Sequence, residues 1–225
     1  MKKNALSIIF SFILFAVFNT ANAQDPEIFK QKGYKLKFIN QDPKLDPAMK
    51  ERMVKTFFQV YPVLVNEYNK KSLKEVTFVV DTTYDGVAGA ANGQVTFSSN
   101  WLRIHPEDID VITHEVMHIV QDYGNTNGPF WLTEGIADYV RYKFGVDNAG
   151  AKWALPDLKP DHSYKSSYRI TARFLEWLER NGNKGIVKKM DKHMREHSYK
   201  DDLWKEYAGK SIDELWTAYT ANPAL

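Results

Sequence analysis

The sequence contains no cysteine among its 225 residues. This absence excludes disulfide bonds, thiolate nucleophiles, iron–sulfur clusters and zinc sites built on cysteine. Any metal ion must therefore be bound by histidine, aspartate or glutamate side chains. Long hydrophobic runs are missing as well. The main apolar run, Leu6–Phe18, has thirteen residues, which is fewer than the roughly 20 that cross a bilayer.

The chain also lacks an excess of charge of one sign. It carries 30 Lys and Arg against 28 Asp and Glu, and the count without Lys2 and Lys3 is 28 of each sign. A balanced chain does not offer the basic surface that nucleic acids require, so we expect no nucleic-acid partner. The composition, with 44% hydrophobic and 14% aromatic residues, is that of a folded protein with a substantial core.

The N-terminus has the pattern of a secretory signal peptide. Two lysines precede the apolar run, and the sequence Ala-Asn-Ala at 21–23 supplies small residues for cleavage. We therefore expect residues 1–23 to be a signal peptide and residues 24–225 to form a single domain. The mature protein should be secreted or periplasmic, monomeric and not attached to the membrane.

Hydrophobic periodicity predicts an α+β domain with a small mixed sheet first and a mostly helical C-terminal part. Strands are expected over residues 34–39, 75–81 and 94–98. A long helix opened by Asp46 and Pro47 should lie between the first two strands and be kinked or broken near Pro62. Further helices are expected from Pro106 to about Gly124, from Phe130 to before Gly145, and over residues 168–180, 184–197 and 211–221. Residues 145–167 show no period and are expected to form a surface loop.

The helix expected from Pro106 contains the motif His-Glu-Val-Met-His at residues 114–118. On a helix His114 and His118 lie about 40° apart around the axis, so both imidazoles can bind one ion. Glu115 projects about 100° away from His114, where it can reach a water molecule on that ion without being a ligand. This arrangement is typical of zinc hydrolases. The structural alternative is a core helix with two buried histidines.

A candidate for a third ligand, Glu134, follows sixteen residues after His118 on the next expected helix. Two histidines and one glutamate leave the open coordination position that a catalytic zinc ion needs. Asp138 lies one helical turn beyond Glu134, where it can accept a hydrogen bond from the second ring nitrogen of a ligand histidine. The alternative is that both acids belong to a solvated helix face.

Four separated blocks follow in order along the chain: residues 81–88, 114–118, 134–141 and 168–175. Together they resemble the plant basic secretory protein family, and the resemblance extends from about Tyr34 to about Tyr219. That family is placed among the gluzincin-type metallopeptidases. The resemblance implies a zincin-like fold, an active-site helix between the sheet and the helical part, and a peptide or protein substrate.

The resemblance also implies a role for each residue of the site. The zinc ligands would be His114, His118 and Glu134, the general base Glu115, and the orienting acid Asp138. Two departures from the family limit what can be carried over. The mature chain is not basic, and residues 163–167 lack the tryptophan and glycine that are typical of the family at that place.

A second donor to the oxyanion is usual at such a site. Tyr168 is the candidate, because it begins a helix within one of the four blocks, although it can equally be a core aromatic residue. His162 and Tyr164 are the other options. The resemblance further implies that an edge strand at 94–98 pairs with the extended substrate, and the alternative is an ordinary edge strand.

We therefore expect a secreted zinc-dependent endopeptidase. One alternative is a secreted protein that binds peptides or glycans and uses zinc only to join two helices. Another is a zinc amidase that acts on a cell-wall or glycan-linked substrate. The pair His193 and His197 has helical spacing but no third ligand, so no second metal site is expected.

Overall fold

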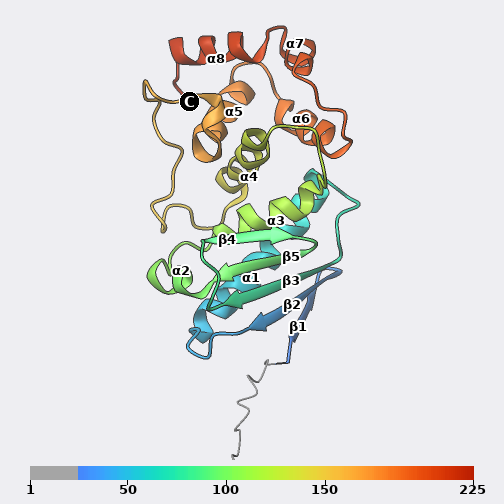
Figure 1. Cartoon of the computed structure of the whole chain (residues 1–225), viewed down its shortest axis with the longest axis vertical. Helices are drawn as coiled ribbons and strands as arrows, with labels where there is room; N and C mark the ends of the chain where they lie inside the picture. The colour runs from blue at the N-terminus through green and yellow to red at the C-terminus, as the bar shows by residue number, and fades with distance from the viewer. Residues whose placement is uncertain (1–24) are drawn as a thin grey trace, which may run out of the picture.

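The computed structural model describes residues 25–225 (Figure 1). The signal peptide expected over residues 1–23 lies outside the described residues. Within residues 25–225, no helix combines the length and the hydrophobicity that a membrane span requires.

A five-stranded mixed sheet forms the lower part of the molecule in Figure 1. Its strands are β1 (Glu27–Gln31), β2 (Tyr34–Asn40), β3 (Glu75–Asp81), β4 (Ala88–Ala91) and β5 (Gln94–Ser98). The order across the sheet is β1-β2-β3-β5-β4, with β2, β3 and β5 parallel and the outer strands antiparallel to their neighbours. The central position of β3 follows from its sequence, because Val76, Phe78 and Val80 are fully buried.

The edge of the sheet differs from the prediction. The expected strand at 94–98 exists as β5, but β4 covers it, so the prediction that residues 94–98 form the edge strand is wrong. The turn at Asn92 and Gly93, both with positive φ, joins β4 directly to β5. The sequence Ala-Gly-Ala-Ala of β4 has low strand propensity, so this short edge strand gives no sequence signal.

The long helix α1 (Pro47–Glu67) packs against β2 and against the helix that carries the motif. Its start is as predicted, because the Asp46 carboxylate accepts a hydrogen bond from the Ala48 N–H at 2.9 Å and Pro47 is the first helical residue. The helix is continuous through Pro62, so the expected break is wrong. Tyr61 and Leu64, on the inner side of the helix near Pro62, are fully buried, and their packing offsets the hydrogen bond that proline removes.

The helix expected from Pro106 begins five residues later, as α3 (Val111–Gln121). Residues 106–110 form turns instead, and a separate short helix, α2 (Ser99–Ile104), precedes them. The fully buried carboxylate of Asp110 ends this turn segment and accepts hydrogen bonds from the N–H groups of Val146 and Asp147 at 2.7 and 2.6 Å. These bonds hold the start of α3 against a loop that is distant in sequence, which hydrophobic periodicity does not reveal.

The upper part of the molecule is helical, as predicted (Figure 1). It contains α4 (Phe130–Phe144), the 3-10 turn η1 (Tyr164–Ser166), α5 (Tyr168–Arg180), α6 (Ile186–Arg195), α7 (Asp202–Ala208) and α8 (Ile212–Ala221). The predicted bounds of α4 and α5 are confirmed, and α8 begins with the expected capping box between Ser211 and Glu214. The short elements α2, α7, β1 and β4 were not predicted.

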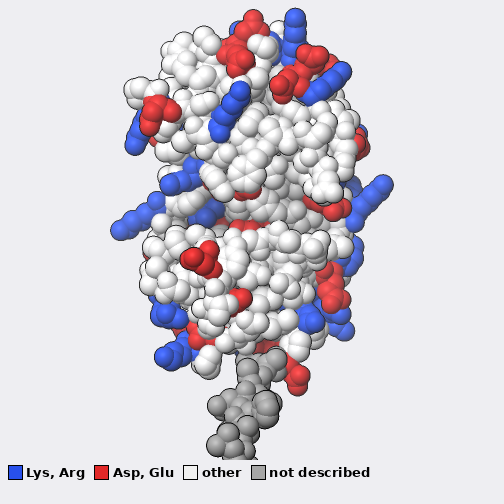
Figure 2. All heavy atoms as spheres, in the orientation of Figure 1, with Lys and Arg blue, Asp and Glu red and all other residues white. Residues whose placement is uncertain are grey.

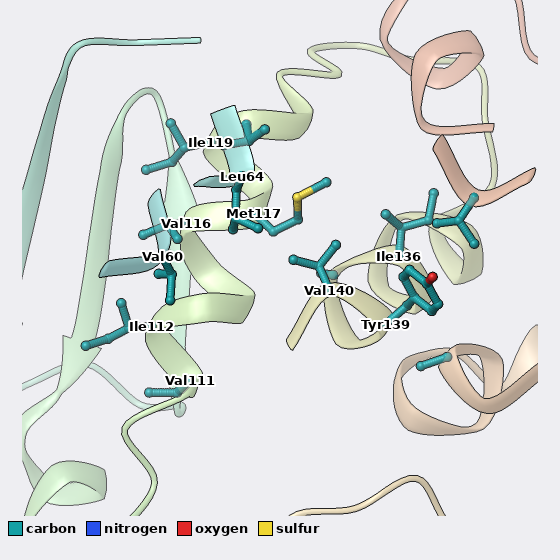
Figure 3. Close-up of a cluster of buried hydrophobic side chains, with 14 of the residues drawn as sticks. Val60, Leu64, Val111, Ile112, Val116, Met117, Ile119, Ile136, Tyr139 and Val140 are labelled. Carbon is teal, nitrogen blue, oxygen red and sulfur yellow. The ribbon is translucent and has the colours of Figure 1, made fainter. Parts of the chain in front are cut away.

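Helix α3 lies between the two parts. Val116 packs on the side of α1, near Val60 and Leu64, whereas Met117 points toward Val140 of α4 (Figure 3). These side chains are fully or almost fully buried. Apolar contacts on both sides therefore fix the orientation of α3 and of the polar side chains that it carries.

Candidate metal centre

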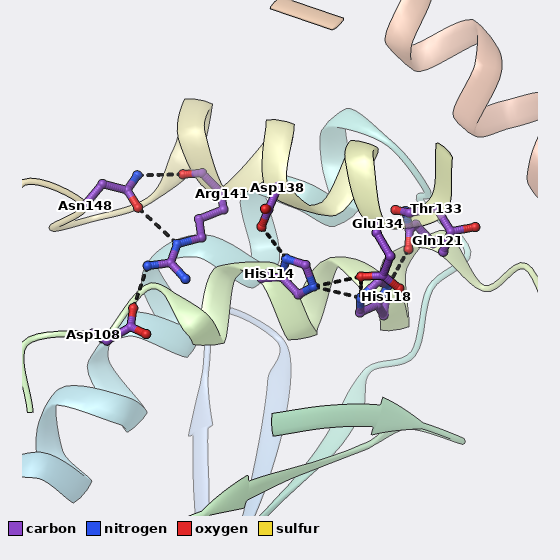
Figure 4. Close-up of polar contacts among 9 residues, drawn as sticks. All are labelled: Asp108, His114, His118, Gln121, Thr133, Glu134, Asp138, Arg141 and Asn148. Carbon is purple, nitrogen blue, oxygen red and sulfur yellow. Dashed lines mark hydrogen bonds and ion pairs between the residues drawn. The ribbon is translucent and has the colours of Figure 1, made fainter. Parts of the chain in front are cut away.

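Two histidines of α3 and one glutamate of α4 converge in the structure (Figure 4). The Nε2 atoms of His114 and His118 are 3.1 Å apart. Glu134 Oε2 lies 3.3 Å from His114 Nε2 and 3.5 Å from His118 Nε2. Because α3 and α4 pack against each other, residues sixteen positions apart in sequence meet at one point.

The spacing of these three atoms fits a small divalent ion. Tetrahedral coordination with bonds of about 2.1 Å places ligand atoms about 3.4 Å from one another. The three observed distances, 3.1, 3.3 and 3.5 Å, are all close to this value. Two neutral imidazoles and one carboxylate also form a donor set that catalytic metal sites use. The site can therefore hold a metal ion through three protein atoms.

The remaining ring nitrogens are held by hydrogen bonds. His114 Nδ1 lies 2.7 Å from Asp138 Oδ1, and His118 Nδ1 lies 2.7 Å from Gln121 Oε1. Both oxygen atoms accept hydrogen bonds, so each ring carries a proton on Nδ1 and turns Nε2, the atom that would bind an ion, toward the other ligand atoms. The two acceptors thus orient the histidines for metal binding.

Gln121 is the site residue that the sequence analysis missed. Its side-chain nitrogen donates to the main-chain oxygen of Thr133 at 2.9 Å, which fixes the amide with its oxygen toward His118. The signal was available in the spacing, because Gln121 lies three residues after His118 and therefore on the same side of α3. Asp138, in contrast, was expected in the role of an orienting acid and lies next to His114.

The electrostatics of the pocket favour positive charge at the ligand atoms. Burial lowers the pKa of His114, but hydrogen bonds with Asp138 and Glu134 outweigh it and raise the value to about 10. Burial raises the pKa of Glu134, yet the two histidines lower it to about 2. The carboxylates therefore stabilise a cation between the rings, whether a proton or a metal ion. The burial of Glu134 and Asp138 also excludes the solvated helix face as an interpretation.

Glu115 lies beside these ligands but is not one of them. Its side chain lines the same groove and is 6% exposed. Burial raises the pKa of the Glu115 carboxyl above its ordinary value, and the nearby histidines partly oppose this rise. A carboxylate with a raised pKa is a better proton acceptor than a solvated one.

The structure separates the three candidates for an oxyanion donor. Tyr168 lines the groove, with its ring stacked at 6.2 Å from the ring of His114. Tyr164 is buried in the helical core and donates its hydroxyl hydrogen to Asp213 at 2.7 Å. His162 is not among the residues that line the groove. Of these three, only Tyr168 is placed where it can reach a substrate.

The backbone that carries Tyr168 is strained. Ser167 and Tyr168 have φ values of 64° and 49°, a region that side chains with a Cβ atom seldom occupy. The Thr171 hydroxyl donates to the main-chain oxygen of Tyr164 at 2.6 Å and ties the preceding turn to α5. Such strain is found at functional sites, where the surrounding structure holds it in place.

A groove of about 1070 Å³ crosses the molecule over the ligands. Its walls come from β4, the segment around Trp101, the loop around Trp153 and the start of α5. Figure 2 shows this hollow, with red carboxylate groups between the upper and lower parts of the molecule. The ligand atoms are thus accessible from solvent along an open channel rather than sealed in a core.

The other histidine pair does not form a metal site. His193 Nδ1 lies 2.7 Å from Ser198 Oγ, and its Nε2 lies 3.0 Å from the hydroxyl of Tyr207. Both ring nitrogens are therefore in hydrogen bonds with hydroxyl groups. Among residues 25–225, the group of His114, His118 and Glu134 is the one cluster of three side chains with the geometry for an ion.

A family profile described as a peptidase of plants and bacteria, BSP, matches residues 35–219. The chain belongs to this family. The resemblance to basic secretory proteins is thereby confirmed, and the BSP family is described as one of peptidases. No curated protein sequence matches it.

Two solved structures are similar to this BSP family member. An aminopeptidase N family protein from Idiomarina loihiensis aligns with a TM-score of 0.52 and 11% identity over 85% of the chain and 46% of that protein. A two-domain M1 zinc metallopeptidase, solved as a mutant bound to L-tryptophan, aligns with a TM-score of 0.42 and 13% identity over 91% of the chain and 49% of that protein. The chain spans about half the length of each. The first similarity confirms the zincin-like α+β fold.

Proposed function

We propose that the protein is a secreted, zinc-dependent endopeptidase. The observation that carries the proposal is the set of three ligand atoms, mutually 3.1 to 3.5 Å apart, that opens onto a groove next to a buried glutamate. Zinc is the ion that suits two imidazoles and one carboxylate in tetrahedral geometry. Secretion rests on the signal-peptide pattern of residues 1–23.

The residues of the site divide the chemistry among them. A bound zinc ion supplies Lewis acidity, which lowers the pKa of water toward about 7 and polarises the substrate carbonyl group. Glu115 accepts the proton of the attacking water molecule and transfers it to the leaving amine. The Tyr168 hydroxyl donates a hydrogen bond to the carbonyl oxygen as negative charge develops there. Asp138 and Gln121 hold the two imidazoles in place.

The edge strand β4 offers a place for an extended peptide. Ser98 N–H donates to the Val87 oxygen at 3.0 Å, so Val87 faces β5. Hydrogen-bonding direction alternates along an antiparallel pair, and the N–H and C=O groups of Ala88 and Ala90 therefore point away from β5. Both residues line the groove. A peptide that adds to β4 gains main-chain hydrogen bonds without strong selection of its side chains.

A binding protein with a purely structural zinc ion is the competing interpretation. Structural zinc sites are usually closed by four protein ligands. The cluster in the described part of the chain has three, and the buried Glu115 stands beside it with no ion-pair partner within 4.0 Å. These features favour catalysis over a structural role.

Peptide hydrolysis by four purified proteins tests the proposal: the wild type, Glu115→Gln, Tyr168→Phe and His118→Ala. We expect Glu115→Gln to retain zinc and lose at least about 10³-fold in kcat, because the proton acceptor is gone. Tyr168→Phe should retain zinc and lose about 10²-fold, which is the effect of removing one oxyanion donor. His118→Ala should lose both zinc and turnover. Equal, low hydrolysis by all four proteins would contradict the proposal and favour the binding protein.

A further inference from the structure

One end of the groove carries two cations that form no ion pair within residues 25–225. Lys152 and Arg169 line the groove and are exposed, and within residues 25–225 neither has an acidic side chain within 4.0 Å. Arg141 lies at the same end but forms an ion pair with Asp108, so it contributes no free charge. An exposed carboxylate, Glu107, also lines this end and leaves a net charge of +1.

The ring of Trp153 lies beside two cationic side chains at this end. The guanidinium groups of Arg141 and Arg169 lie 4.5 and 6.0 Å from the ring centre of Trp153. Trp101 also lines the groove and donates its indole hydrogen to Asp108 at 3.2 Å. Arg169 and the ion-paired Arg141 are thus placed beside a flat apolar surface. In Figure 2, blue side chains gather at the left of the hollow, on the side where Figure 1 shows α2 and the loop after α4.

The direction of β4 determines which part of a peptide reaches this end. Ala88 pairs with Phe97, and β5 continues from there into α2 with Trp101. The start of β4 is therefore near the cationic end, and Ala91 is at the far end. Antiparallel pairing is the more stable arrangement for an added strand. A peptide paired in this way runs from Ala91 toward Ala88, which brings its C-terminal part to Trp101, Lys152 and Arg169.

The length of α4 between Glu134 and Arg141 gives the distance from the candidate metal ligands to the cationic end of the groove. Arg141 is seven residues beyond Glu134, which corresponds to about 10 Å along a helix. An extended peptide covers about 3.3 Å per residue. The cationic end is therefore about three residues away from the bond that faces the candidate metal ligands.

From this placement we propose that Lys152 and Arg169 bind a carboxylate group of the substrate, about three residues on the C-terminal side of the cleaved bond. The inference rests on the proposed function. The carboxylate is either an Asp or Glu side chain or the C-terminus of a short peptide. Trp153 packs against the apolar part of the same residue. The protein would thus select acidic or short peptides. This selection comes from a local pair of cations, since the charge of the whole sequence is balanced.

Binding of four matched peptides tests the proposal. The peptides are N-acetylated, alanine-based and eight residues long, and they differ only in having Asp or Asn at the sixth position and a free or amidated C-terminus. Zinc-loaded Glu115→Gln serves as the binding protein so that turnover does not interfere. Arg169→Gln and Lys152→Gln are added singly to it, and Lys55→Gln is the control, because Lys55 is an exposed lysine outside the groove.

We expect peptides with a carboxylate to bind about tenfold more tightly than the Asn amide peptide at low salt. Arg169→Gln and Lys152→Gln should each reduce this ratio by about three- to fivefold, the upper range for an exposed ion pair, whereas Lys55→Gln should leave it unchanged. The Asp amide and Asn acid peptides show which carboxylate is bound. A ratio near one, or a ratio that neither variant changes, overturns the proposal.

Hydrolysis of the same peptides by the wild type keeps the two proposals separate. Cleavage of all four peptides at the same rate, with equal affinities, refutes the carboxylate subsite and leaves the peptidase proposal standing. A binding preference that Arg169→Gln abolishes, without cleavage of any peptide, supports the subsite and refutes the peptidase proposal.

Discussion

At the scale of single residues, the two metal-facing histidines are supported unequally. His114 has a charged acceptor, Asp138, whereas His118 has a neutral one, Gln121. Both distances are 2.7 Å, but the carboxylate increases the basicity of its imidazole more than an amide does. The negative charge of Asp138 also contributes to the attraction of the pocket for a cation.

Removal of either acceptor should weaken metal binding without removing a ligand. We expect Asp138→Ala to weaken zinc affinity about 100-fold and Gln121→Ala about tenfold, the range known for residues that orient ligands. Competition with a chromophoric chelator measures both affinities. Asp122→Asn is a matched control, because Asp122 is an exposed acid just after α3 that does not line the groove. Unchanged affinity in Asp138→Ala would contradict the role of the carboxylate.

At the scale of secondary-structure elements, β4 is the element on which the substrate proposal depends. Its four residues are small, and its outer edge faces the groove. Ala90 has its N–H directed away from β5, as the alternation from Val87 indicates. Proline is tolerated at an edge position where the N–H faces outward.

Ala90→Pro should therefore reduce kcat/KM by about fivefold while changing the free energy of unfolding little. One main-chain hydrogen bond to the substrate is lost, and a hydrogen bond of this kind contributes about 1 kcal/mol. Ala90→Ser keeps the N–H at nearly the same size and is the control. Steady-state kinetics with a peptide substrate and urea unfolding give the two quantities. Equal kcat/KM values for the two variants would show that β4 does not bind the substrate backbone.

The elements with strong periodicity were predictable from the sequence, and the short ones were not. The run Glu75–Asp81 and the helices α4 and α5 have enough buried residues to give a clear pattern. The strand β4 has four small residues, and the start of α3 depends on Asp110, whose partners lie 36 and 37 residues away. Such long-range hydrogen bonds leave no local pattern.

The candidate site was more predictable than the fold around it. The ligand spacing is set by helix geometry alone, so the HEVMH motif already indicated that two imidazoles meet. The prediction of Glu134 as the third ligand also required that the chain reverse its direction between α3 and α4, so that the two helices pack together. The spacing places Gln121 on the same side of α3 as His118, but it does not show which way the amide is turned, which the Thr133 oxygen fixes. The sequence gives no account of that contact.

At the scale of the whole molecule, α6 connects the sheet part with the helical part. Arg195 donates to the main-chain oxygens of Tyr68 at 2.9 Å and Gln121 at 3.3 Å. The buried Asp191 accepts hydrogen bonds from Arg195 at 2.7 Å and from the hydroxyl of Tyr123 at 2.9 Å. This network holds the C-terminal end of α3, next to the groove.

The buried Asp191 should make stability depend on pH. Burial raises the pKa of Asp191 to about 6, although Arg195 and Tyr123 oppose this rise. In the unfolded chain the pKa is about 3.9. At pH values between these two pKa values, Asp191 keeps its proton in the folded chain and releases it in the unfolded chain. The stability that the protonated group provides is present below pH 4 and is lost as the pH rises through 6, by about 2–3 kcal/mol.

Asp191→Asn mimics the protonated carboxyl group, so this variant should not lose stability as the pH rises through 6. The difference in free energy of unfolding between the wild type and Asp191→Asn is therefore expected to fall by about 2–3 kcal/mol from pH 4 to pH 7. Urea unfolding at several pH values measures it. Asp202→Asn, a change at an exposed acid, should show a constant difference. A pH-independent difference for Asp191→Asn would mean that the carboxylate is fully stabilised by its partners.

Anomalous diffraction at the zinc absorption edge, from crystals of the zinc-loaded protein, tests the central claim most directly. We predict one strong peak at about 2.0–2.2 Å from Nε2 of His114, Nε2 of His118 and one carboxylate oxygen of Glu134. The remaining coordination position should be filled by solvent, within reach of Glu115. A peak elsewhere, or a fourth protein atom bound to the ion, would contradict the account.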